Sequence, residues 1–442
     1  MNEEGQSRIP LWRQLQAAAG LVGAVRGGVS GTAALEVVDP ALRPGAQALA
    51  YQALRALGRA EALRRLLAPR KPAPQVDALL CTALALIWDE AQAPYESFTL
   101  VNQSVEAAKR SPALRGQAGF VNGCLRRFLR ERKPLVERTE ALPVARWNHP
   151  AWWIERVRRD HPAQWQDILQ ANNHQAPMTL RVNVRKTDVE AYLLQLQQAG
   201  IEARRNGESG VTLARPRPVQ AIPGFAAGLV SVQDAGAQLA APLLLQGLAQ
   251  NADLHVLDAC AAPGGKTAHL LELADCTVTA MEIDARRAER IEQNLQRMGL
   301  QARVRVANAA QPEDWWDGRL FDAILLDAPC TASGIVRRHP DVRWLRREAD
   351  IDQLASQQSR LLEALWPLLK PGGRLLYCTC SVFKVEGSQQ MQTFLANNRQ
   401  ARLLPSPGHL LPHFAARSDA VPDNQDGDHD GFYYALLEKI AP

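Results

Sequence analysis

Cysteines at the ends of two apolar runs are the residues of this sequence best suited to chemistry. The run LLDAPC ends in Asp327, Pro329 and Cys330, and the run YCTCS contains Cys378 and Cys380. Both runs are typical of buried strands, whose carboxyl ends meet at one edge of a sheet. A single buried cysteine is by default a small hydrophobic residue, but two thiols at one edge indicate a reactive site. Side-chain alternation puts Cys378 and Cys380 on the same side of a strand and does not choose between them.

These thiols suit the modification of a pyrimidine base. A thiolate that adds to carbon 6 of the ring makes an enamine, whose carbon 5 can attack an electrophilic methyl group. Asp327 is placed to hold the ring nitrogen and the exocyclic amine, and a second thiol would help to remove the proton from carbon 5. Zinc is the alternative for the CTC sequence. The two cysteines of CTC are separated by one residue, and no His or Cys pair lies nearby at metal-site spacing. The sequence therefore predicts no metal site.

A glycine-containing loop precedes these runs and predicts a nucleoside site. The sequence DACAAPGGKT, residues 258–267, follows a strand pattern and precedes a helical one, so Gly264 and Gly265 let backbone amides approach a ligand. The loop lacks the G-x-G-x-x-G spacing of a nicotinamide dehydrogenase. The next strand ends in Glu282, which can accept hydrogen bonds from ribose hydroxyls. Asp284 is better explained as the cap of the following helix.

Basic residues concentrate in the first half of the chain. The net charge is +6 for residues 1–140 (19 basic, 13 acidic), +3 for 141–235 (11, 8) and −4 for 236–442 (21, 25). The segment RRHPDVRWLRR, residues 337–347, adds guanidinium groups for phosphates and Trp344 for stacking, although a salt-bridged surface helix is the alternative. The residues predicted to contact RNA are Arg126, Arg127, Arg130, Arg337, Arg338, Arg343, Arg346 and Arg347.

The elements that must position these residues fall into three predicted domains. Residues 8–140 form an all-α bundle of five to seven helices, with breaks at 27–31, 69–74 and 111–112. In its last helix Phe120, Val121, Cys124, Leu125 and Phe128 are predicted to face the core. Residues 133–150 are predicted to be a linker because of their prolines. Residues 145–234 form a small α+β domain. Residues 235–442 alternate strand and helix, which predicts an α/β doubly wound Rossmann-like sheet.

Composition excludes several other classes of protein. The chain of 442 residues is 46% hydrophobic and 22% charged, which is typical of a folded globular protein. The apolar start at residues 15–25 is too short for a membrane span and lacks the pattern of a signal peptide. Seven cysteines, an odd number, favour reduced thiols in the cytosol over a disulfide framework. We therefore expect a cytoplasmic protein that needs neither membrane nor metal.

Taken together, the motifs DACAAPGGKT, MEIDARR, LLDAPC and YCTCSV resemble those of the RNA (cytosine-5) methyltransferases that use S-adenosylmethionine. The likeness is strongest to the branch that modifies small-subunit (16S) ribosomal RNA, and it covers nearly the whole chain. The sequence FVNGCLRRFLR is similar to the NusB-like front domain of that branch. HPAWWIERV, ANNHQAPMTLRVN, IPGFAAGLVSVQDAGAQ and DGFYYALLEK match its later segments.

This resemblance implies roles for individual residues. The nucleophile falls on Cys380 and the thiol that releases the product on Cys330, although enzymes that methylate DNA cytosines use the PC cysteine as nucleophile. Asp327 lies at the junction of cofactor and base. Asn308 stands where relatives carry an aspartate near the adenine, and its amide can still accept a hydrogen bond. The residues implied to bind the cofactor are Cys260, Ala261, Ala262, Pro263, Gly264, Gly265, Lys266, Glu282, Asn308 and Asp327.

The resemblance also implies the partner, small-subunit ribosomal RNA. We expect a monomer, although the sequence does not determine the oligomeric state. Two alternatives remain open. The same chemistry could act on transfer RNA, or the chain could be an RNA-binding ribosome assembly factor without catalysis. A methyl-transfer assay and a cofactor-binding measurement would distinguish these alternatives.

Overall fold

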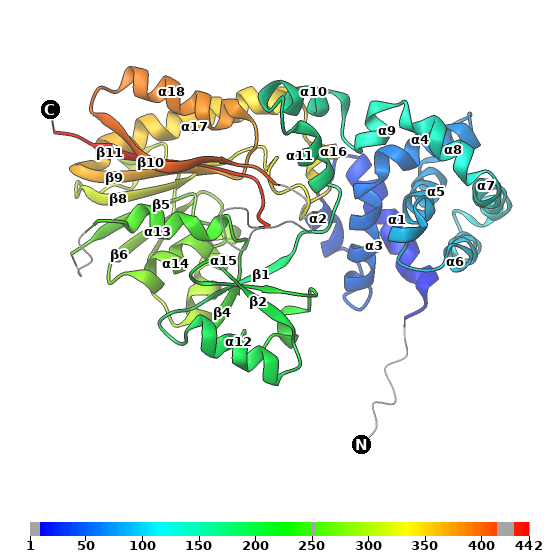
Figure 1. Cartoon of the computed structure of the whole chain (residues 1–442), viewed down its shortest axis with the longest axis horizontal. Helices are drawn as coiled ribbons and strands as arrows, with labels where there is room; N and C mark the ends of the chain where they lie inside the picture. The colour runs from blue at the N-terminus through cyan, green and yellow to red at the C-terminus, as the bar shows by residue number, and fades with distance from the viewer. Residues whose placement is uncertain (1–8, 249–252, 413–427, 442) are drawn as a thin grey trace. The chain divides into compact units, whose positions relative to one another are not determined.

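The computed structural model describes residues 9–248, 253–412 and 428–441 (Figure 1). The chain forms two compact units. One unit comprises residues up to His174 together with Val336–Arg347. The other comprises Gln175–Ile335 and the chain from Glu348 onward. Among the described residues no helix is long and apolar enough to cross a membrane.

The first unit is helical, as the sequence predicts. Its breaks fall where glycine and proline were expected, since one helix ends at Arg26 and others begin at Gly31 and Pro74. Leucine and alanine fill its core. The helices are α1 (Leu11–Arg26), α2 (Gly31–Glu36), α3 (Arg43–Arg55), α4 (Leu57–Leu67), α5 (Pro74–Ile87), α6 (Ser97–Arg110) and α7 (Ala118–Arg130).

The core face of α7 is narrower than predicted. Val121, Cys124, Leu125 and Phe128 are buried, at the spacing that places residues on one helix face. Phe120 is 37% exposed, so its assignment to the core was wrong. It lies one position before Val121 and therefore about 100° around the helix from it.

The predicted linker at residues 133–150 is also wrong, because two helices occupy it. These are α8 (Arg132–Glu140) and α9 (Pro143–Trp147). Proline lacks only an N–H group that the first turn of a helix leaves unpaired, so Pro134 and Pro143 are tolerated there. The unit continues through α10 (Ala151–Asp160) and α11 (Trp165–Ala171) and includes the short α16 (Val342–Leu345).

The second unit contains a small antiparallel sheet in the order β2-β3-β1-β4. Its strands are β1 (Met178–Val182), β2 (Ala203–Asn206), β3 (Gly210–Leu213) and β4 (Val230–Val232), and α12 (Val189–Gln198) packs on it. The strands near Val211 and Val230 and the helix over 187–199 were predicted, whereas β2 was not. Its sequence ARRN lacks a strand pattern.

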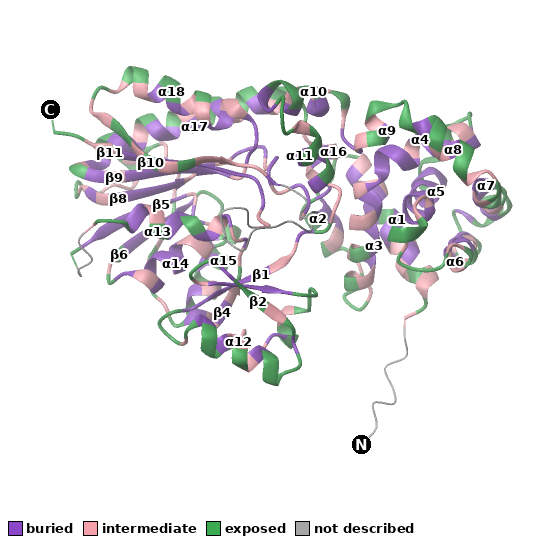
Figure 2. Cartoon of the chain, in the orientation of Figure 1, coloured by how far each residue is buried: buried purple, intermediate pink, exposed green. Residues whose placement is uncertain are grey.

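The large sheet of this unit has the order β10-β11-β9-β8-β5-β6-β7. The five strands β5 to β9 are parallel, as predicted. Figure 2 shows the central strands buried. Their bounds are β5 (His255–Ala259), β6 (Thr277–Glu282), β7 (Arg303–Val306), β8 (Phe321–Asp327) and β9 (Leu369–Thr379).

Helices cover both faces of the large sheet, which makes it doubly wound. Alternate residues of one strand enter different cores, for example Leu325 on one face and Leu326 on the other. One face packs against α13 (Ala240–Leu245), α14 (Gly265–Leu273) and α15 (Ala285–Met298). The other packs against α17 (Ala349–Leu365) and α18 (Ser388–Asn397).

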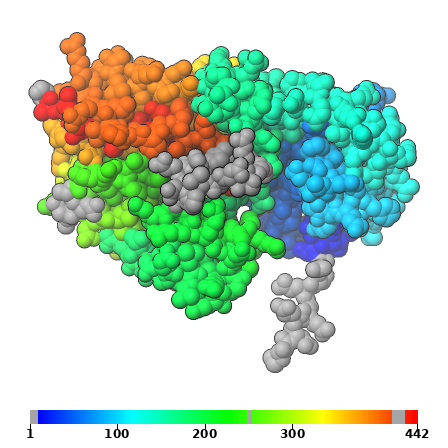
Figure 3. Space-filling model, in the orientation of Figure 1, coloured from blue at the N-terminus to red at the C-terminus, as the bar shows by residue number. Residues whose placement is uncertain are grey.

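Two antiparallel strands, β10 (Ala401–Leu410) and β11 (Phe432–Lys439), extend the sheet beyond the predicted pattern. Because it contains Pro405 and Pro407, the sequence of β10 indicates a loop and not a strand. They are tolerated because β10 is an edge strand and its register shifts between Leu404 and Gly408. In the space-filling view α18 and β10, in orange, lie at the surface of this unit (Figure 3).

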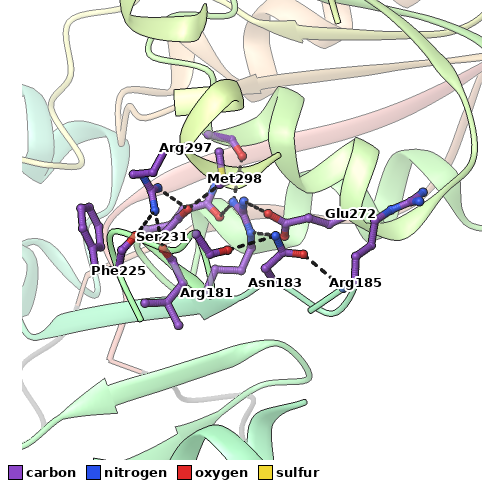
Figure 4. A network of polar contacts seen from close by, with 12 residues as sticks. Arg181, Asn183, Arg185, Phe225, Ser231, Glu272, Arg297 and Met298 are labelled. Carbon is purple, nitrogen blue, oxygen red and sulfur yellow. Dashed lines mark hydrogen bonds and ion pairs between the residues drawn. The ribbon is translucent and has the colours of Figure 1, made fainter. Parts of the chain in front are cut away.

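A buried ion pair joins the small sheet to α14, a helix that packs on the large sheet (Figure 4). The Arg181 guanidinium of β1 donates to both carboxylate oxygens of Glu272 on α14, at 2.7 and 2.8 Å. It also donates to the carbonyl oxygen of Gly265 at 2.8 Å, and both side chains are at most 1% exposed. Arg297 of α15 makes a second link by donating to the carbonyl oxygen of Phe225 at 2.7 Å. The small sheet thus holds the helix that follows the glycine loop.

Replacing Arg181 with Met should lower the free energy of unfolding of this unit by about 3–5 kcal/mol, because the Glu272 carboxylate would stay buried without its partner. Denaturant unfolding measures the loss. The double variant R181M/E272L should recover most of it. Breaking the exposed pair Arg402–Glu438 with R402A should cost at most about 1 kcal/mol. An equal cost for both single variants would contradict the assignment.

Candidate active site

The parallel register of β8 and β9 brings two cysteines together. Asp327, the last residue of β8, is paired with Cys378 on β9. The loops that follow these two strands carry Cys330 and Cys380, whose sulfur atoms are 3.4 Å apart. Residues fifty positions apart therefore form one thiol pair at the carboxyl edge of the sheet.

The structure distinguishes Cys378 from Cys380, which the sequence pattern did not. Cys378 is fully buried in the core, and its sulfur lies 3.6 Å from an Asp327 carboxylate oxygen. Burial and the nearby Asp327 charge raise the pKa of Cys378 well above its ordinary value, so its thiol stays protonated. Cys380 follows the end of the strand and is only half-buried. Cys380 is therefore the accessible thiol of the CTC sequence.

Cys330 carries a proton under ordinary conditions. Its hydrogen bond to Cys380 raises its pKa well above the usual range, and burial adds to this effect. Cys260, in the glycine loop, is a further thiol of this region, and burial raises its pKa to about 12. Neither Cys330 nor Cys260 has the low pKa of an activated thiolate.

Asp327 is paired with Lys266 at the same edge. The Lys266 ammonium lies 2.5 Å from the second Asp327 carboxylate oxygen. Burial alone would lower the pKa of Lys266, but the Asp327 charge raises it well above its ordinary value. Lys266 thus remains a cation that holds Asp327 between the glycine loop and the thiols. The sequence placed Lys266 only among cofactor contacts.

The glycine loop and the end of β6 fit a nucleoside-type cofactor. Gly264 has φ +92°, and a Cβ atom there would lie 3.0 Å from Ile291 and be strained. Glu282 is buried, and its Oε1 atom accepts the backbone N–H groups of Ile283 and Asp284. Its Oε2 atom is buried without a hydrogen-bond partner. Such an orphaned acceptor matches a ribose hydroxyl donor.

Two other residues near this loop have local partners. Asp284 caps α15 by accepting the Arg287 N–H at 3.0 Å, as the sequence analysis expected. The Asn308 side-chain N–H donates to the Gln311 side-chain oxygen at 2.7 Å, and Asn308 Oδ1 accepts the Ala310 N–H at 3.1 Å. The Asn308 side-chain oxygen retains a second lone pair that can accept a further hydrogen bond.

The segment at residues 337–347 does not form the exposed phosphate-binding surface that was predicted. Arg337 and Arg343 are buried at 3% and 0% exposure, so the expectation of surface arginines is wrong for these two. Arg343 donates to the carbonyl oxygens of Asn148 and Asn172, which end α9 and α11. Helix ends leave carbonyl groups unpaired, and Arg343 satisfies them. Arg338 and Arg346 are half-buried and Arg347 is exposed.

Trp344 is also engaged within the helical unit, because its indole N–H donates to the carbonyl oxygen of Leu54 at 2.8 Å. The arginines predicted on α7 are more accessible. Arg126 and Arg130 are exposed, and Arg127 forms an i,i+4 ion pair with Glu131 at 3.1 Å. The α7 helix thus exposes two of its three predicted arginines, whereas the segment at 337–347 exposes one of five.

Sequence reasoning missed two buried carboxylates near the thiols. Asp258 ends the β5 pattern and accepts the Thr267 hydroxyl at 2.5 Å. Glu386 follows the TCS sequence and is fully buried. No signal marked Glu386, because an isolated glutamate in a loop is usually solvated. Among the described residues no group of three or more His, Cys, Asp or Glu side chains is arranged to hold a metal.

The sheet and its glycine loop define a Rossmann-like methyltransferase. A solved methyltransferase homolog protein from Pyrococcus horikoshii is 27% identical, with a TM-score of 0.55 over 67% of this chain and 97% of that one. NSun6 from Pyrococcus horikoshii shares the fold at 18% identity, with a TM-score of 0.57 over 66% of this chain and 99% of that one.

Family models identify the parts of the chain. The 16S rRNA methyltransferase RsmB/F model matches residues 245–438, a ferredoxin-like domain of RsmF/B-like methyltransferases matches 149–220, and the NusB family matches 27–130. The ribosomal RNA small subunit methyltransferase B of Vibrio vulnificus (strain YJ016) is 43% identical over 350 residues, covering 77% of this chain and 78% of the relative. That of Serratia proteamaculans (strain 568) is 43% identical over 336 residues, 75% of each chain. The chain belongs to the RsmB/F family of 16S rRNA methyltransferases.

Asp258 gives the stability of its unit a pH dependence. Burial raises its pKa from 3.8 to about 7, so the folded state binds more protons than the unfolded state between these values. Its contribution to stability should therefore fall as the pH rises from about 4 to about 7 and then level off. The difference in unfolding free energy between wild type and D258N measures this slope. Changing the exposed Glu289 to Gln should leave the slope intact; a pH-independent difference for D258N would contradict the assignment.

Proposed function

We propose that this chain transfers a methyl group from S-adenosylmethionine to carbon 5 of a cytosine in small-subunit ribosomal RNA. The observation that carries the proposal is the pair of sulfur atoms 3.4 Å apart, beside Asp327 and the cofactor loop. Membership of the RsmB/F family supports the RNA substrate, and the names of its Vibrio and Serratia relatives support the small subunit.

The cofactor has a site that its chemistry suits. S-adenosylmethionine, when bound, supplies an electrophilic methyl group on a sulfonium sulfur. The unpartnered oxygen of Glu282 would accept from its ribose, and the backbone beside Gly264 and Gly265 would approach it closely. Lys266 would keep the Asp327 carboxylate directed toward the junction of cofactor and base.

Cys380 acts as the nucleophile in the proposed reaction. Its thiolate adds to carbon 6 of the cytosine, and the electrons of the 5,6 double bond make carbon 5 nucleophilic. Carbon 5 would then take the methyl group, and the sulfur of the cofactor would leave as a neutral thioether. The Asp327 carboxylate accepts hydrogen bonds from the ring nitrogen and exocyclic amine, which stabilises the protonated ring of the adduct. The half-buried position of Cys380 supports this role, whereas Cys378 is sealed in the core.

Cys330 completes the cycle by accepting the proton from carbon 5. Loss of that proton restores the double bond and expels the Cys380 thiolate from carbon 6. The raised pKa of Cys330 in the free enzyme comes first from its hydrogen bond to Cys380, then from burial, and then from the Cys380 charge. Once Cys380 is bonded to carbon, the first and third of these effects are removed. The pKa of Cys330 therefore falls at this stage, its thiol releases its proton to solvent, and the resulting thiolate accepts the proton from carbon 5.

Purified protein incubated with tritiated S-adenosylmethionine and undermodified small-subunit RNA should produce labelled 5-methylcytosine. Transfer RNA is the matched control substrate. If only transfer RNA became labelled, transfer RNA would be the substrate in place of ribosomal RNA. Absence of label on both, under conditions that work for a relative, would refute the activity. Failure to bind cofactor in calorimetry would favour a non-catalytic assembly factor.

The two cysteines should behave differently when removed. C380A should abolish turnover because the nucleophile is lost. C330A should bind RNA, form the adduct and fail to release it, so that a protein–RNA complex persists on a denaturing gel. The reverse pattern would assign the nucleophile to Cys330, as in DNA enzymes.

The exposed arginines of α7 should contribute to RNA affinity through phosphate contacts. In the full-length chain, R126A/R130A should weaken RNA binding and reduce the slope of log affinity against log salt by about 1.4–1.8. Arg399, an exposed arginine of the other unit, serves as the control when changed to Ala. An unchanged salt slope in R126A/R130A would remove α7 from the RNA surface.

A further inference from the structure

A buried carboxylate lies between the two loops that carry the thiols. Glu386 is fully buried, and its Oε2 atom accepts two hydroxyl groups. One is the Thr331 hydroxyl at 2.5 Å and the other is the Ser381 hydroxyl at 2.6 Å. Thr331 directly follows Cys330 in the chain, and Ser381 directly follows Cys380. A single oxygen atom therefore binds the residue after each thiol.

The other oxygen of Glu386 extends the same network. Oε1 accepts the Thr331 backbone N–H at 2.9 Å and the Gln358 side-chain N–H at 3.2 Å. The Gln358 side chain also donates to the carbonyl oxygen of Pro329 at 2.9 Å. The backbone carbonyl oxygen of Glu386 accepts the Tyr377 hydroxyl at 2.8 Å. The loop after β8, the strand β9 and the helix α17 are all tied to one residue.

Only a carboxylate satisfies this set of partners. The Thr331 N–H and the Gln358 amide can only donate at these contacts, and the two hydroxyls donate as well. Glutamine would turn an N–H₂ group toward one of these donor pairs and lose its acceptor. Burying a carboxylate is costly unless it is fully hydrogen-bonded, so a buried residue of this kind needs a reason to be there.

We propose that Glu386 is a positioning residue, which fixes the separation and orientation of Cys330 and Cys380. This rests on the proposed function for its consequence in catalysis. The thiols sit on two separate loops after strand ends, and neither loop alone determines the distance between the sulfur atoms. Glu386 makes them one rigid unit. The negative charge of Glu386 also contributes to raising the pKa of Cys330, and this favours the protonated thiol in the free enzyme.

The first test compares E386Q with the wild type in steady-state methyl transfer. Misplaced reacting groups cost on the order of 10- to 100-fold in rate, so kcat should fall by that factor. KM for cofactor and for RNA should stay within about twofold, because Glu386 lies outside both predicted binding sites. D322N removes a carboxylate at the opposite end of β8 and serves as the control. Equal losses of kcat in both variants, or a loss confined to KM, would overturn the proposal.

A second test measures the thiol spacing without any methyl transfer. Diamide, an azo oxidant, takes two electrons and two protons from a thiol pair, which leaves a disulfide and a hydrazine. In the wild type the Cys330–Cys380 disulfide should form readily and be detected by peptide mass analysis. It should form at least about tenfold more slowly in E386Q. C330A should give no such linkage. The same rate in E386Q and wild type would overturn the proposal even if no RNA substrate were ever found.

Single hydroxyl deletions provide variants that disturb folding less. S381A removes one bond to Glu386 and should lower both rates in the same direction as E386Q, by a smaller factor. Because both changes break the same interaction, E386Q/S381A should be no slower than E386Q alone. Fully additive losses would show that Ser381 and Glu386 act independently, which contradicts a shared positioning network.

Discussion

The parallel pairing of β8 with β9 is the constraint on which the rest of the site depends. Its register sets Asp327 beside Cys378, and both strands then end within a few residues at the same edge. Hydrogen bonds of the parallel ladder fix where each following loop begins. A slip of one residue would turn Asp327 away from Lys266 and separate the two thiols. Backbone pairing therefore determines where the reactive side chains lie.

Buried and partly buried charges hold this edge in place. Arg181 with Glu272 secures the helix after the glycine loop, and Lys266 with Asp327 secures the loop itself. Glu386 adds a buried carboxylate, satisfied by hydroxyl and amide donors. Each would be costly alone, and each is matched by partners from a different element. Positions that must be accurate are thus fixed by polar networks whose geometry is directional, while the apolar cores supply most of the stability.

The arginine-rich segment at 337–347 shows that a composition typical of RNA binding can instead serve internal packing. Five arginines and a tryptophan in a short stretch are typical of an RNA surface. In this chain the helices α9 and α11 end near Arg343, and their unpaired carbonyl groups take up its guanidinium. Further hydrogen bonds within the same helical unit are formed by the side chains of Arg55, Trp344 and Asp341. The segment is largely a structural part of the helical unit.

The sequence by itself determined the class of fold, the glycine loop and the two apolar runs that end in thiols, because these depend on local periodicity and on residue type. It also predicted the cap at Asp284, which needs only neighbouring backbone groups. The tertiary structure alone decided that Cys378 is sealed in the core and Cys380 is accessible, that Pro405 and Pro407 lie in an edge strand, and that Glu386 joins two loops. These outcomes depend on which distant segments become neighbours, and no local pattern encodes the partners that a buried donor or acceptor will meet.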